Sequence, residues 1–245
     1  MSQPKTLAVV VGVGGGIGGA LARRMAEQDR YDAVLGVARR RPEDWPDDGA
    51  CPFVAADVTD EVQVAGAART IDQLGVPVRI VVATGLLHAE GVTPEKSLRA
   101  LDPEALMTLF RVNAVAPALI AKHLLPLTPR DRISLFAALS ARVGSISDNR
   151  LGGWHGYRAS KAALNMLIAT LAIEHRRNRP MGVCVALHPG TVDTRLSAPF
   201  GQGASAAPKR LTPDQSAAAL IEVMDRLGPE DTGRFFAWDG QPIPW

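Results

Sequence analysis

Residues 7–22 read LAVVVGVGGGIGGALA, and this stretch decides the fold. An apolar run at residues 7–11 is followed at once by a glycine-rich turn at residues 12–19 and then by residues that favour a helix. Glycine lets the backbone turn tightly and approach a pyrophosphate, whose charge is met by the N–H groups and the positive dipole end of the following helix. The order of strand, glycine turn and helix therefore predicts a dinucleotide-binding site.

The glycine turn fits two spacings. Gly14, Gly16 and Gly19 match the pattern GxGxxG, whereas Gly12, Gly16 and Gly18 match GxxxGxG, and either spacing places the phosphates at the same turn. A tight turn in an ordinary strand–helix unit is the alternative interpretation. No Gly-Lys pair occurs in the chain, which excludes the phosphate loop of kinases and ATPases. The turn residues that we expect to contact a dinucleotide are Gly12, Gly14, Gly16, Ile17 and Gly18.

Short apolar runs alternate with stretches of helical periodicity along the rest of the chain. Apolar runs of this kind are typical of buried strands, and parallel strands need crossover helices between them. The alternation predicts one α/β domain over residues 1–245, a doubly wound Rossmann fold with a mostly parallel sheet of about seven strands. Besides residues 7–11, strands are expected at residues 33–37, 52–55, 80–83, 133–136, 183–187 and 235–238. Helices are expected at residues 20–28, 62–74, 103–123, 157–177 and 213–227, the last with a capping box at Thr212, Pro213 and Gln215.

The end of the second expected strand indicates which dinucleotide binds. An Asp or Glu about 20 residues beyond the turn usually holds the ribose 2′-hydroxyl of NAD, whereas Arg meets the 2′-phosphate of NADP. Here the strand is followed by Arg39, Arg40 and Arg41, with no carboxylate at its end. Because a guanidinium can grip a phosphate with two hydrogen bonds, NADP(H) is favoured through Arg39, while NAD(H) stays possible. An ordinary basic surface loop is the alternative.

Composition narrows the class of protein. The chain has 245 residues, of which 47% are apolar, and its 27 basic and 25 acidic residues leave a formal net charge of +2, which does not favour nucleic acid as a partner. Cys51 and Cys184 form no CxxC pair, so free thiols and a cytoplasmic protein are expected. No apolar run approaches the roughly 18 residues of a membrane span, so no membrane partner is expected. His88, His155 and His188 lack the spacing of paired metal ligands, so no metal site is expected.

Tyr157 and Lys161 lie four residues apart at the start of an expected helix, so both side chains project from one face. A nearby ammonium favours the phenolate over the phenol. We therefore expect Lys161 to lower the pKa of Tyr157 from about 10 towards neutrality, as a general acid for carbonyl reduction needs. An exposed helical pair with no chemical role is the alternative.

Six motifs, in this order, resemble the short-chain dehydrogenase/reductase family. The resemblance runs from the first strand to residues 235–240 and so covers nearly the whole chain. Within the family, the segment that begins at Ser140 is similar to the C-factor-like branch. The motifs are the Gly12, Gly16 and Gly18 turn, Asp57-Val58, Asn113, Ser140, Tyr157-x-x-x-Lys161 and Pro189-Gly190.

The resemblance implies catalytic roles for four of these residues. Hydride would pass between nicotinamide and a carbonyl or alcohol carbon. Tyr157 would give a proton to the substrate oxygen, Ser140 would hold this oxygen, and Lys161 would bind the nicotinamide ribose. Asn113 would distort its helix and hold a water molecule for proton relay.

The resemblance also implies contacts to the rest of the cofactor. Asp57 and Val58 would lie beside the adenine. The loop at residues 189–194 would lie beside the nicotinamide, with Thr191 or Thr194 near the carboxamide or the diphosphate. The remaining cofactor contacts expected are Gly85, Tyr157, Lys161, Pro189, Gly190, Val192 and Thr194.

Three features depart from the family pattern. Val11 stands where a Thr is usual, and Val82-Ala83-Thr84-Gly85 replaces an Asn-Asn-Ala-Gly stretch, which reduces polar support under the cofactor. The glycine of that stretch still permits a close backbone approach. The segment after Ser140 is longer than the commonest family spacing, so Ser145 and Ser147 are rivals to Ser140.

The sequence thus predicts an NADP(H)-dependent carbonyl reductase, or the reverse alcohol dehydrogenase, acting on a small molecule. Its pocket would be walled by residues 86–92, 139–154 and 197–210, the last rich in Ala, Gly, Ser and Pro and expected to be a mobile loop. A cofactor-binding signalling or interaction protein with little turnover is the alternative. The helix at residues 157–177 is apolar on more than one face, which indicates either a homodimer or homotetramer or a neighbouring helix as its cover.

Overall fold

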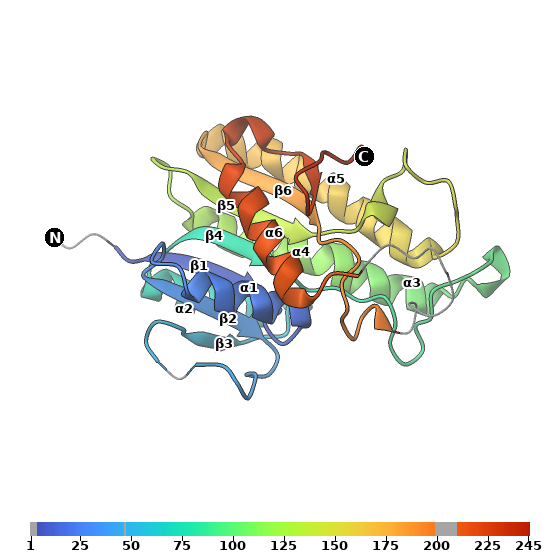
Figure 1. Cartoon of the computed structure of the whole chain (residues 1–245), viewed down its shortest axis with the longest axis horizontal. Helices are drawn as coiled ribbons and strands as arrows, with labels where there is room; N and C mark the ends of the chain where they lie inside the picture. The colour runs from blue at the N-terminus through green and yellow to red at the C-terminus, as the bar shows by residue number, and fades with distance from the viewer. Residues whose placement is uncertain (1–3, 47, 199–209) are drawn as a thin grey trace.

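A parallel sheet forms the centre of the structure, a computed structural model that describes residues 4–46, 48–198 and 210–245. Within these residues seven strands pair in the order β3-β2-β1-β4-β5-β6-β7, and every pairing is parallel (Figure 1). The predicted Rossmann fold is confirmed, with a fully parallel sheet in place of a mostly parallel one. The strands are β1 (Thr6–Val11), β2 (Ala33–Ala38), β3 (Phe53–Ala55), β4 (Val76–Val82), β5 (Ser134–Leu139), β6 (Gly182–His188) and β7 (Phe235–Ala237).

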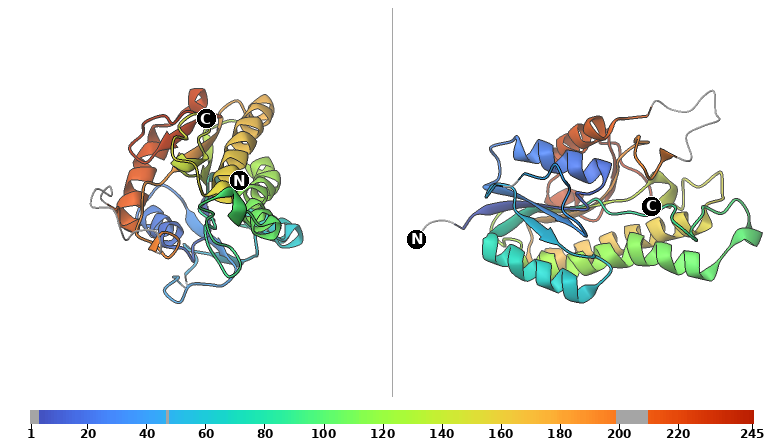
Figure 2. Two further views of the ribbon diagram at one scale, coloured as in Figure 1. Left: turned by 90° about the vertical axis from the view of Figure 1, so that its right-hand side faces the viewer. Right: turned by 90° about the horizontal axis from the view of Figure 1, so that it is seen from below.

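Helices cover both faces of the sheet. α1 and α6 pack on one face, and α2, α4 and α5 pack on the other (Figures 1 and 2). The α-helices are α1 (Gly16–Ala26), α2 (Glu61–Leu74), α3 (Pro103–Phe110), α4 (Ala116–Leu124), α5 (His155–Asn178) and α6 (Pro213–Arg226). The shorter turns are η1 (Leu98–Ala100), η2 (Arg111–Val115), η3 (Leu125–Leu127), η4 (Arg142–Gly144) and η6 (Pro229–Asp231).

The two hydrophobic cores follow from the alternation of side chains along each strand. In β1, Leu7, Val9 and Val11 face the core under α2, α4 and α5, whereas Ala8 and Val10 face the core under α1 and α6. A strand buried on both faces has no polar side to solvate, which is why the central strands read as continuous apolar runs.

Strand β4 begins earlier than predicted. It starts at Val76, whereas the prediction placed its start at residue 80. The prediction was late because the polar Arg79 interrupts the apolar run in the sequence. The Arg79 side chain is buried, and its guanidinium forms an ion pair with Asp225 of α6 at 2.7 Å and lies 5.7 Å from the ring centroid of Tyr31. These partners come from distant parts of the chain, so the sequence window around β4 cannot indicate them.

The helix predicted at residues 103–123 is present but contains one wide turn. α3 runs into a π-helical turn at η2, which continues as α4. The run Pro103–Leu127 has the length and apolar composition of a membrane-spanning helix. In this fold, however, Leu109, Ile120 and Leu124 are buried inside the molecule, as in the core helix of an α/β domain.

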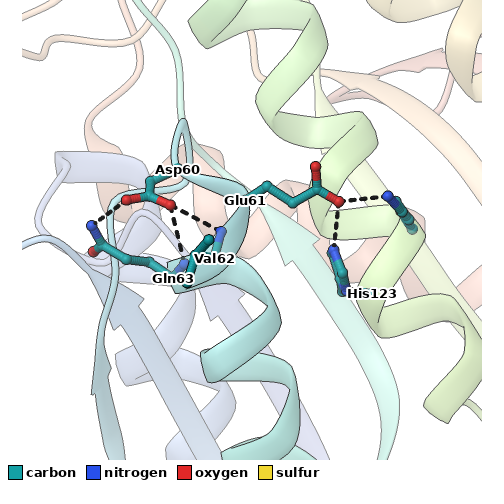
Figure 3. Close-up of polar contacts among 6 residues, drawn as sticks. Asp60, Glu61, Val62, Gln63 and His123 are labelled. Atoms are coloured by element: carbon teal, nitrogen blue, oxygen red, sulfur yellow. Dashed lines mark hydrogen bonds and ion pairs between the residues drawn. The ribbon is translucent and has the colours of Figure 1, made fainter.

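Helix α2 is fixed at its start by local and tertiary contacts. The Asp60 carboxylate accepts hydrogen bonds from the backbone N–H groups of Val62 and Gln63 and thereby caps the helix (Figure 3). The next residue, Glu61, accepts a hydrogen bond from His123 Nε2 of α4 at 3.2 Å (Figure 3). These contacts hold α2 and α4 side by side on one face of the sheet.

Helix α6 starts with the predicted capping box. Thr212 Oγ1 accepts the N–H of Gln215 at 3.1 Å, and Gln215 Oε1 accepts the N–H of Thr212 at 2.9 Å. Most of the loop predicted to be mobile before this helix, residues 199–209, lies outside the described residues.

Candidate active site

The carboxyl ends of β1 and β4 mark the point where the direction of strand succession reverses. From β1 the chain runs outward to β2 and β3 and then returns to β4 on the other side of β1. Ligands of open parallel sheets bind at such a switch point, outside the carboxyl ends of the strands. The glycine turn follows β1 and Gly85 follows β4, so two predicted cofactor segments meet here.

The geometry of the glycine turn favours the GxxxGxG spacing. Gly12 has a φ of +98°, and its N–H donates to the carbonyl of Val37 at 2.7 Å. A Cβ on Gly18 would collide with the Gly12 carbonyl, so α1 can pack onto the turn only with glycine at this position. A Cβ on Gly16 would lie 3.2 Å from Thr194 Cγ2, which places the predicted loop over the start of α1.

The start of α1 fits the phosphates of a dinucleotide. Gly15, its N-cap residue, has no side chain to satisfy the first N–H groups, and the first turn carries no acidic residue. Thr84 lies against Gly12, and its buried Oγ1 has no hydrogen-bond partner among the described residues. A buried hydroxyl without a partner indicates a ligand contact at this point. Of the other predicted turn residues, Gly14 is exposed and Ile17 is half-buried against the α1 and α6 core.

Arg39 and Asp57 lie just after β2 and β3, the two strands on one side of β1. Arg39 directly follows β2 and is exposed. The pKa of Asp57 is lowered by hydrogen bonds from the N–H and the hydroxyl of Thr59, at 2.9 and 2.8 Å, and also by the positive charge of Arg39. Val58 packs against the core next to them. The structure therefore brings the predicted adenine and 2′-phosphate contacts together.

Tyr157 and Lys161 are both buried on the first turns of α5. Lys161 Nζ lies 5.9 Å from the ring centroid of Tyr157 and donates a hydrogen bond to the Leu139 carbonyl at 2.8 Å. Burial raises the pKa of Tyr157 to about 12 and lowers the pKa of Lys161 to about 7. The predicted lowering of the tyrosine pKa is thus not found in this structure, because burial of the phenol raises its pKa. The phenol stays protonated at neutral pH.

Asn113 sits in the π-helical turn and is fully buried. Its Oδ1 accepts the N–H of Leu86 at 2.7 Å, and its Nδ2 donates to the Leu86 carbonyl at 2.8 Å and to Ser160 Oγ at 3.0 Å. A Cβ on Gly85 would lie 3.6 Å from Lys161 Nζ and 3.7 Å from Asn113 Oδ1. The side chain of Asn113 therefore ties the segment after β4 to α5.

The three candidate serines after β5 all have protein partners. Ser140 Oγ donates to Asn165 Oδ1 at 2.6 Å, Ser145 Oγ accepts the N–H of Asp148 at 3.2 Å, and Ser147 Oγ donates to the Trp245 carbonyl at 2.6 Å. The structure thus does not direct the Ser140 hydroxyl towards Tyr157, as the predicted role of Ser140 would require.

The loop after β6 is held against both α6 and the segment after β7. Gly190 has a φ of +84°, and a Cβ there would lie 2.9 Å from Trp238. The Pro189 carbonyl accepts the Ser216 hydroxyl at 2.7 Å, and Val192 pairs with residue 211 in an isolated bridge. The predicted nicotinamide loop is therefore fixed in position beside the glycine turn.

Sequence analysis missed three residues that support the site, namely Glu95, Ser160 and Asn165. Glu95 is a buried carboxylate that accepts the N–H of Gly156, one residue before Tyr157. Ser160 receives the hydrogen bond from Asn113. Asn165 lies two helical turns after Tyr157 on α5, and a polar residue among the apolar positions of this helix was the available signal. No local pattern distinguishes Glu95 from a surface residue.

Comparison with known proteins agrees with this geometry. A model of the short chain dehydrogenase family matches residues 6–204. The 1-hydroxy-2-glutathionyl-2-methyl-3-butene dehydrogenase of Rhodococcus sp. strain AD45 is 30% identical over 97% of this chain and 98% of its own length. The C-signal protein of Myxococcus xanthus is 33% identical over 61% of this chain and 84% of its own length, in agreement with the predicted C-factor-like branch.

A solved structure supports the same conclusion. The short-chain dehydrogenase/reductase of Burkholderia multivorans with bound NADP superposes with a TM-score of 0.81 at 26% identity, over 99% of this chain and 100% of that one. The family match covers most of the chain, and Lys161 and Asn113 lie together beside Gly85. The chain belongs to the short-chain dehydrogenase/reductase family of oxidoreductases.

Proposed function

We propose that the protein is an NADP(H)-dependent carbonyl reductase, or the reverse alcohol dehydrogenase. The main support for this proposal is the position of the buried residues Tyr157 and Lys161. Lys161 Nζ lies next to Gly85, which follows β4 at the switch point of the sheet. Gly12, Gly18 and the start of α1 would hold the diphosphate. Membership of an oxidoreductase family favours turnover over the alternative of a signalling protein that only binds a cofactor.

Arg39 supports the preference for NADP(H) over NAD(H). It is exposed directly after β2, beside Asp57, and so is free to form paired hydrogen bonds with a 2′-phosphate. No acidic residue occupies the position after β2 that would hold a 2′-hydroxyl. The 2′-phosphate of NADP therefore fits this edge of the site better than the ribose of NAD.

The position of Tyr157 supports its role as the proton donor. When bound, the reduced nicotinamide supplies the hydride that turns the carbonyl carbon into an alcohol carbon. Tyr157, whose pKa is raised to about 12 by burial, gives its phenolic proton to the carbonyl oxygen, and the phenolate then regains a proton from water. Lys161, held by the Leu139 carbonyl, faces the cofactor side and would bind the ribose.

The surroundings of Tyr157 favour an apolar substrate. The Tyr157 ring belongs to an apolar cluster that receives side chains from the segments after β4 and β5, and it packs edge-on against Trp154 with ring centroids 6.3 Å apart. A carbonyl compound with an apolar body would bury that body here. The cluster contains Leu86, Leu87, Val92, Ala105, Leu109, Ala141, Val143, Trp154, Tyr157 and Leu196.

We also propose that the protein is a cytoplasmic homodimer or homotetramer. Cys51 and Cys184 are free and buried, which fits a reducing compartment. Met166 and Ile173 are exposed on the outer side of α5, where a second subunit would cover them.

Binding of the two dinucleotides tests the proposal without a known substrate. NADPH and NADH are titrated in parallel against the parent protein and Arg39→Ala by nicotinamide fluorescence. We expect NADPH to bind the parent at least about tenfold more tightly, near 1.4 kcal/mol, and Arg39→Ala to lose this difference. Arg40→Ala is the matched control and should keep it. If neither dinucleotide binds the parent protein, the proposal is wrong.

Turnover is tested with Tyr157→Phe. This variant keeps the buried ring and removes the phenolic proton donor. It should bind NADPH like the parent and lose at least about 100-fold in kcat with any carbonyl substrate that the parent reduces, because a positioned general acid contributes about 10²–10⁴-fold. Equal kcat values for the two proteins would exclude Tyr157 as the acid.

A further inference from the structure

The end of β5 presents two neighbouring side chains to opposite sides of the sheet. Ala141 has extended backbone, with φ −147° and ψ +146°, so its side chain and that of Ser140 point in opposite directions. Ser140 points to Asn165, whereas Ala141 packs against the apolar cluster that contains Tyr157. The β5 position on the side of Tyr157 therefore carries a methyl group and no hydroxyl.

The Ser140 hydroxyl is bound firmly on its own side. Ser140 and Asn165 are each 3% exposed, and Ser140 Oγ donates to Asn165 Oδ1 at 2.6 Å. Asn165 Nδ2 in turn donates to the Gly144 carbonyl at 3.3 Å. Rotating the hydroxyl towards the substrate would leave the buried Asn165 Oδ1 without a donor, which is unfavourable in a water-free interior.

The hydroxyl groups of the two rival serines, Ser145 and Ser147, also form hydrogen bonds within the protein. Ser147 Oγ donates to the Trp245 carbonyl, away from α5, and its own N–H donates to the same carbonyl at 3.0 Å. Ser145 is buried, and its Oγ accepts the N–H of Asp148 at 3.2 Å. These contacts engage both hydroxyls with other parts of the protein, and Ala141 packs in the apolar cluster that contains Tyr157.

We propose that Tyr157 is the only hydroxyl donor to the substrate oxygen among the residues that the structure describes, and that Ala141 determines substrate specificity for this reason. The inference rests on the proposed function. A second donor at a developing oxyanion is worth about 10²–10³-fold in kcat. A site with one donor reduces at useful rates only those carbonyls that accept hydride readily, namely aldehydes and ketones with electron-withdrawing neighbours. Simple ketones react poorly.

The experiment installs the absent hydroxyl. Ala141→Ser and the parent are assayed at saturating NADPH with 4-nitrobenzaldehyde, an activated carbonyl, and with acetophenone, a simple aryl ketone. We expect the parent to favour the aldehyde strongly and Ala141→Ser to gain at least about tenfold in kcat with acetophenone, with a smaller gain for the aldehyde. Ala105→Ser, which adds a hydroxyl elsewhere in the same apolar cluster, is the matched control and should give no such gain.

Several results would overturn the inference. Ala141→Ser could fold and bind NADPH yet show no gain with acetophenone, or neither protein could reduce either probe. A loss of about 100-fold in kcat for Ser140→Ala or Ser145→Ala, with NADPH affinity retained, would identify that serine as the second donor, and this measurement decides the matter even if Ala141→Ser does not fold. Failure of the proposed function itself looks different, because the parent would then not bind NADPH.

Discussion

At the scale of single residues, burial of the Lys161 amine lowers the stability of the folded protein. Its amine is buried on α5 and has lost its water, and the Leu139 carbonyl, which accepts its hydrogen bond at 2.8 Å, does not replace that hydration. The lowered pKa of about 7 records this cost. Replacing Lys161 by a neutral side chain of similar length should therefore preserve the stability of the fold but impair catalysis.

The pH dependence of stability tests this cost. Between pH 7 and pH 10.5 the unfolded chain binds the Lys161 proton more strongly than the folded chain does, so the free energy of unfolding rises with pH in this window. From pH 7 to pH 8.5 the parent should gain about 1.5 kcal/mol relative to Lys161→Met, measured by urea unfolding of both proteins. The exposed Lys96→Met should follow the parent. Parallel pH profiles for the parent and Lys161→Met would contradict the assignment.

The sequence predicted which residues lie at the site better than it predicted their states. Tyr157, Lys161 and the glycines are identified by spacing, because chemistry at a strand end or on a helix face constrains neighbours along the chain, whereas Asn113 is identified through the family resemblance. The pKa of Tyr157 depends on burial by segments far away in sequence, so the expected direction was wrong for this structure. The partner of the Ser140 hydroxyl lies 25 residues away and has no local signal.

The start of α5 is the element on which the placement of Tyr157 depends. Its N-cap residue, Trp154, has a φ of +50° and provides no side-chain cap. Glu95 supplies the cap instead: both carboxylate oxygens lie 3.2 Å from the N–H of Gly156, and the Glu95 carbonyl accepts the N–H of Trp154 at 2.6 Å. A Cβ on Gly156 would lie 2.8 Å from both Glu95 Oε1 and Leu109 Cδ1, so a larger residue here would displace the Glu95 carboxylate from the helix start. A buried carboxylate at the helix start thus fixes the segment that carries the acid.

Removing this cap should therefore affect catalysis as well as stability. Glu95→Ala should lower the free energy of unfolding by about 1–3 kcal/mol and also lower kcat, whereas Glu95→Gln, which keeps an acceptor, should retain most of both. Asp60→Ala removes the cap of α2 and is the matched control: it should lower stability by about 1 kcal/mol without changing kcat. The role of Glu95 is refuted if its two variants change kcat no more than Asp60→Ala does.

Elements were predicted well where local patterns decide them and poorly where distant contacts do. The capping box of α6 and the strands on both sides of β1 follow from short windows of sequence. The π-helical turn confirms the distortion at Asn113 that the family resemblance implied, but no short window of sequence predicts it, because it accompanies the bonds of Asn113 to Leu86 and Ser160, which lie 27 and 47 residues away. The partner that balances the charge of buried Arg79 in β4 is likewise distant, because Asp225 lies 146 residues away.

At the scale of the whole molecule, the outer side of α5 is where subunit contacts are expected. Met166 and Ile173 are 67% and 63% exposed and stand seven residues apart, on one side of the helix. Light scattering should give at least twice the chain mass of 26.0 kDa for the parent, and the double variant Met166→Lys, Ile173→Lys should be a monomer. Val62→Lys, at a residue 78% exposed on α2, is the control and should leave the mass unchanged. A monomeric parent would exclude the proposed assembly.

The π-helical turn at residues 111–115 divides the helix from α3 to α4 into two separately phased segments. A wide turn takes up one residue more than an α-helical turn, so everything after it is rotated by about 100° relative to an uninterrupted helix. One helical wheel therefore cannot describe both halves. Anyone who transplants this helix, or counts heptads across it to choose surface substitutions, should restart the count at Ala116. Deleting one residue from the wide turn should restore a regular helix and keep the buried faces of both halves towards the core, whereas a deletion elsewhere in α4 would rotate the residues after it.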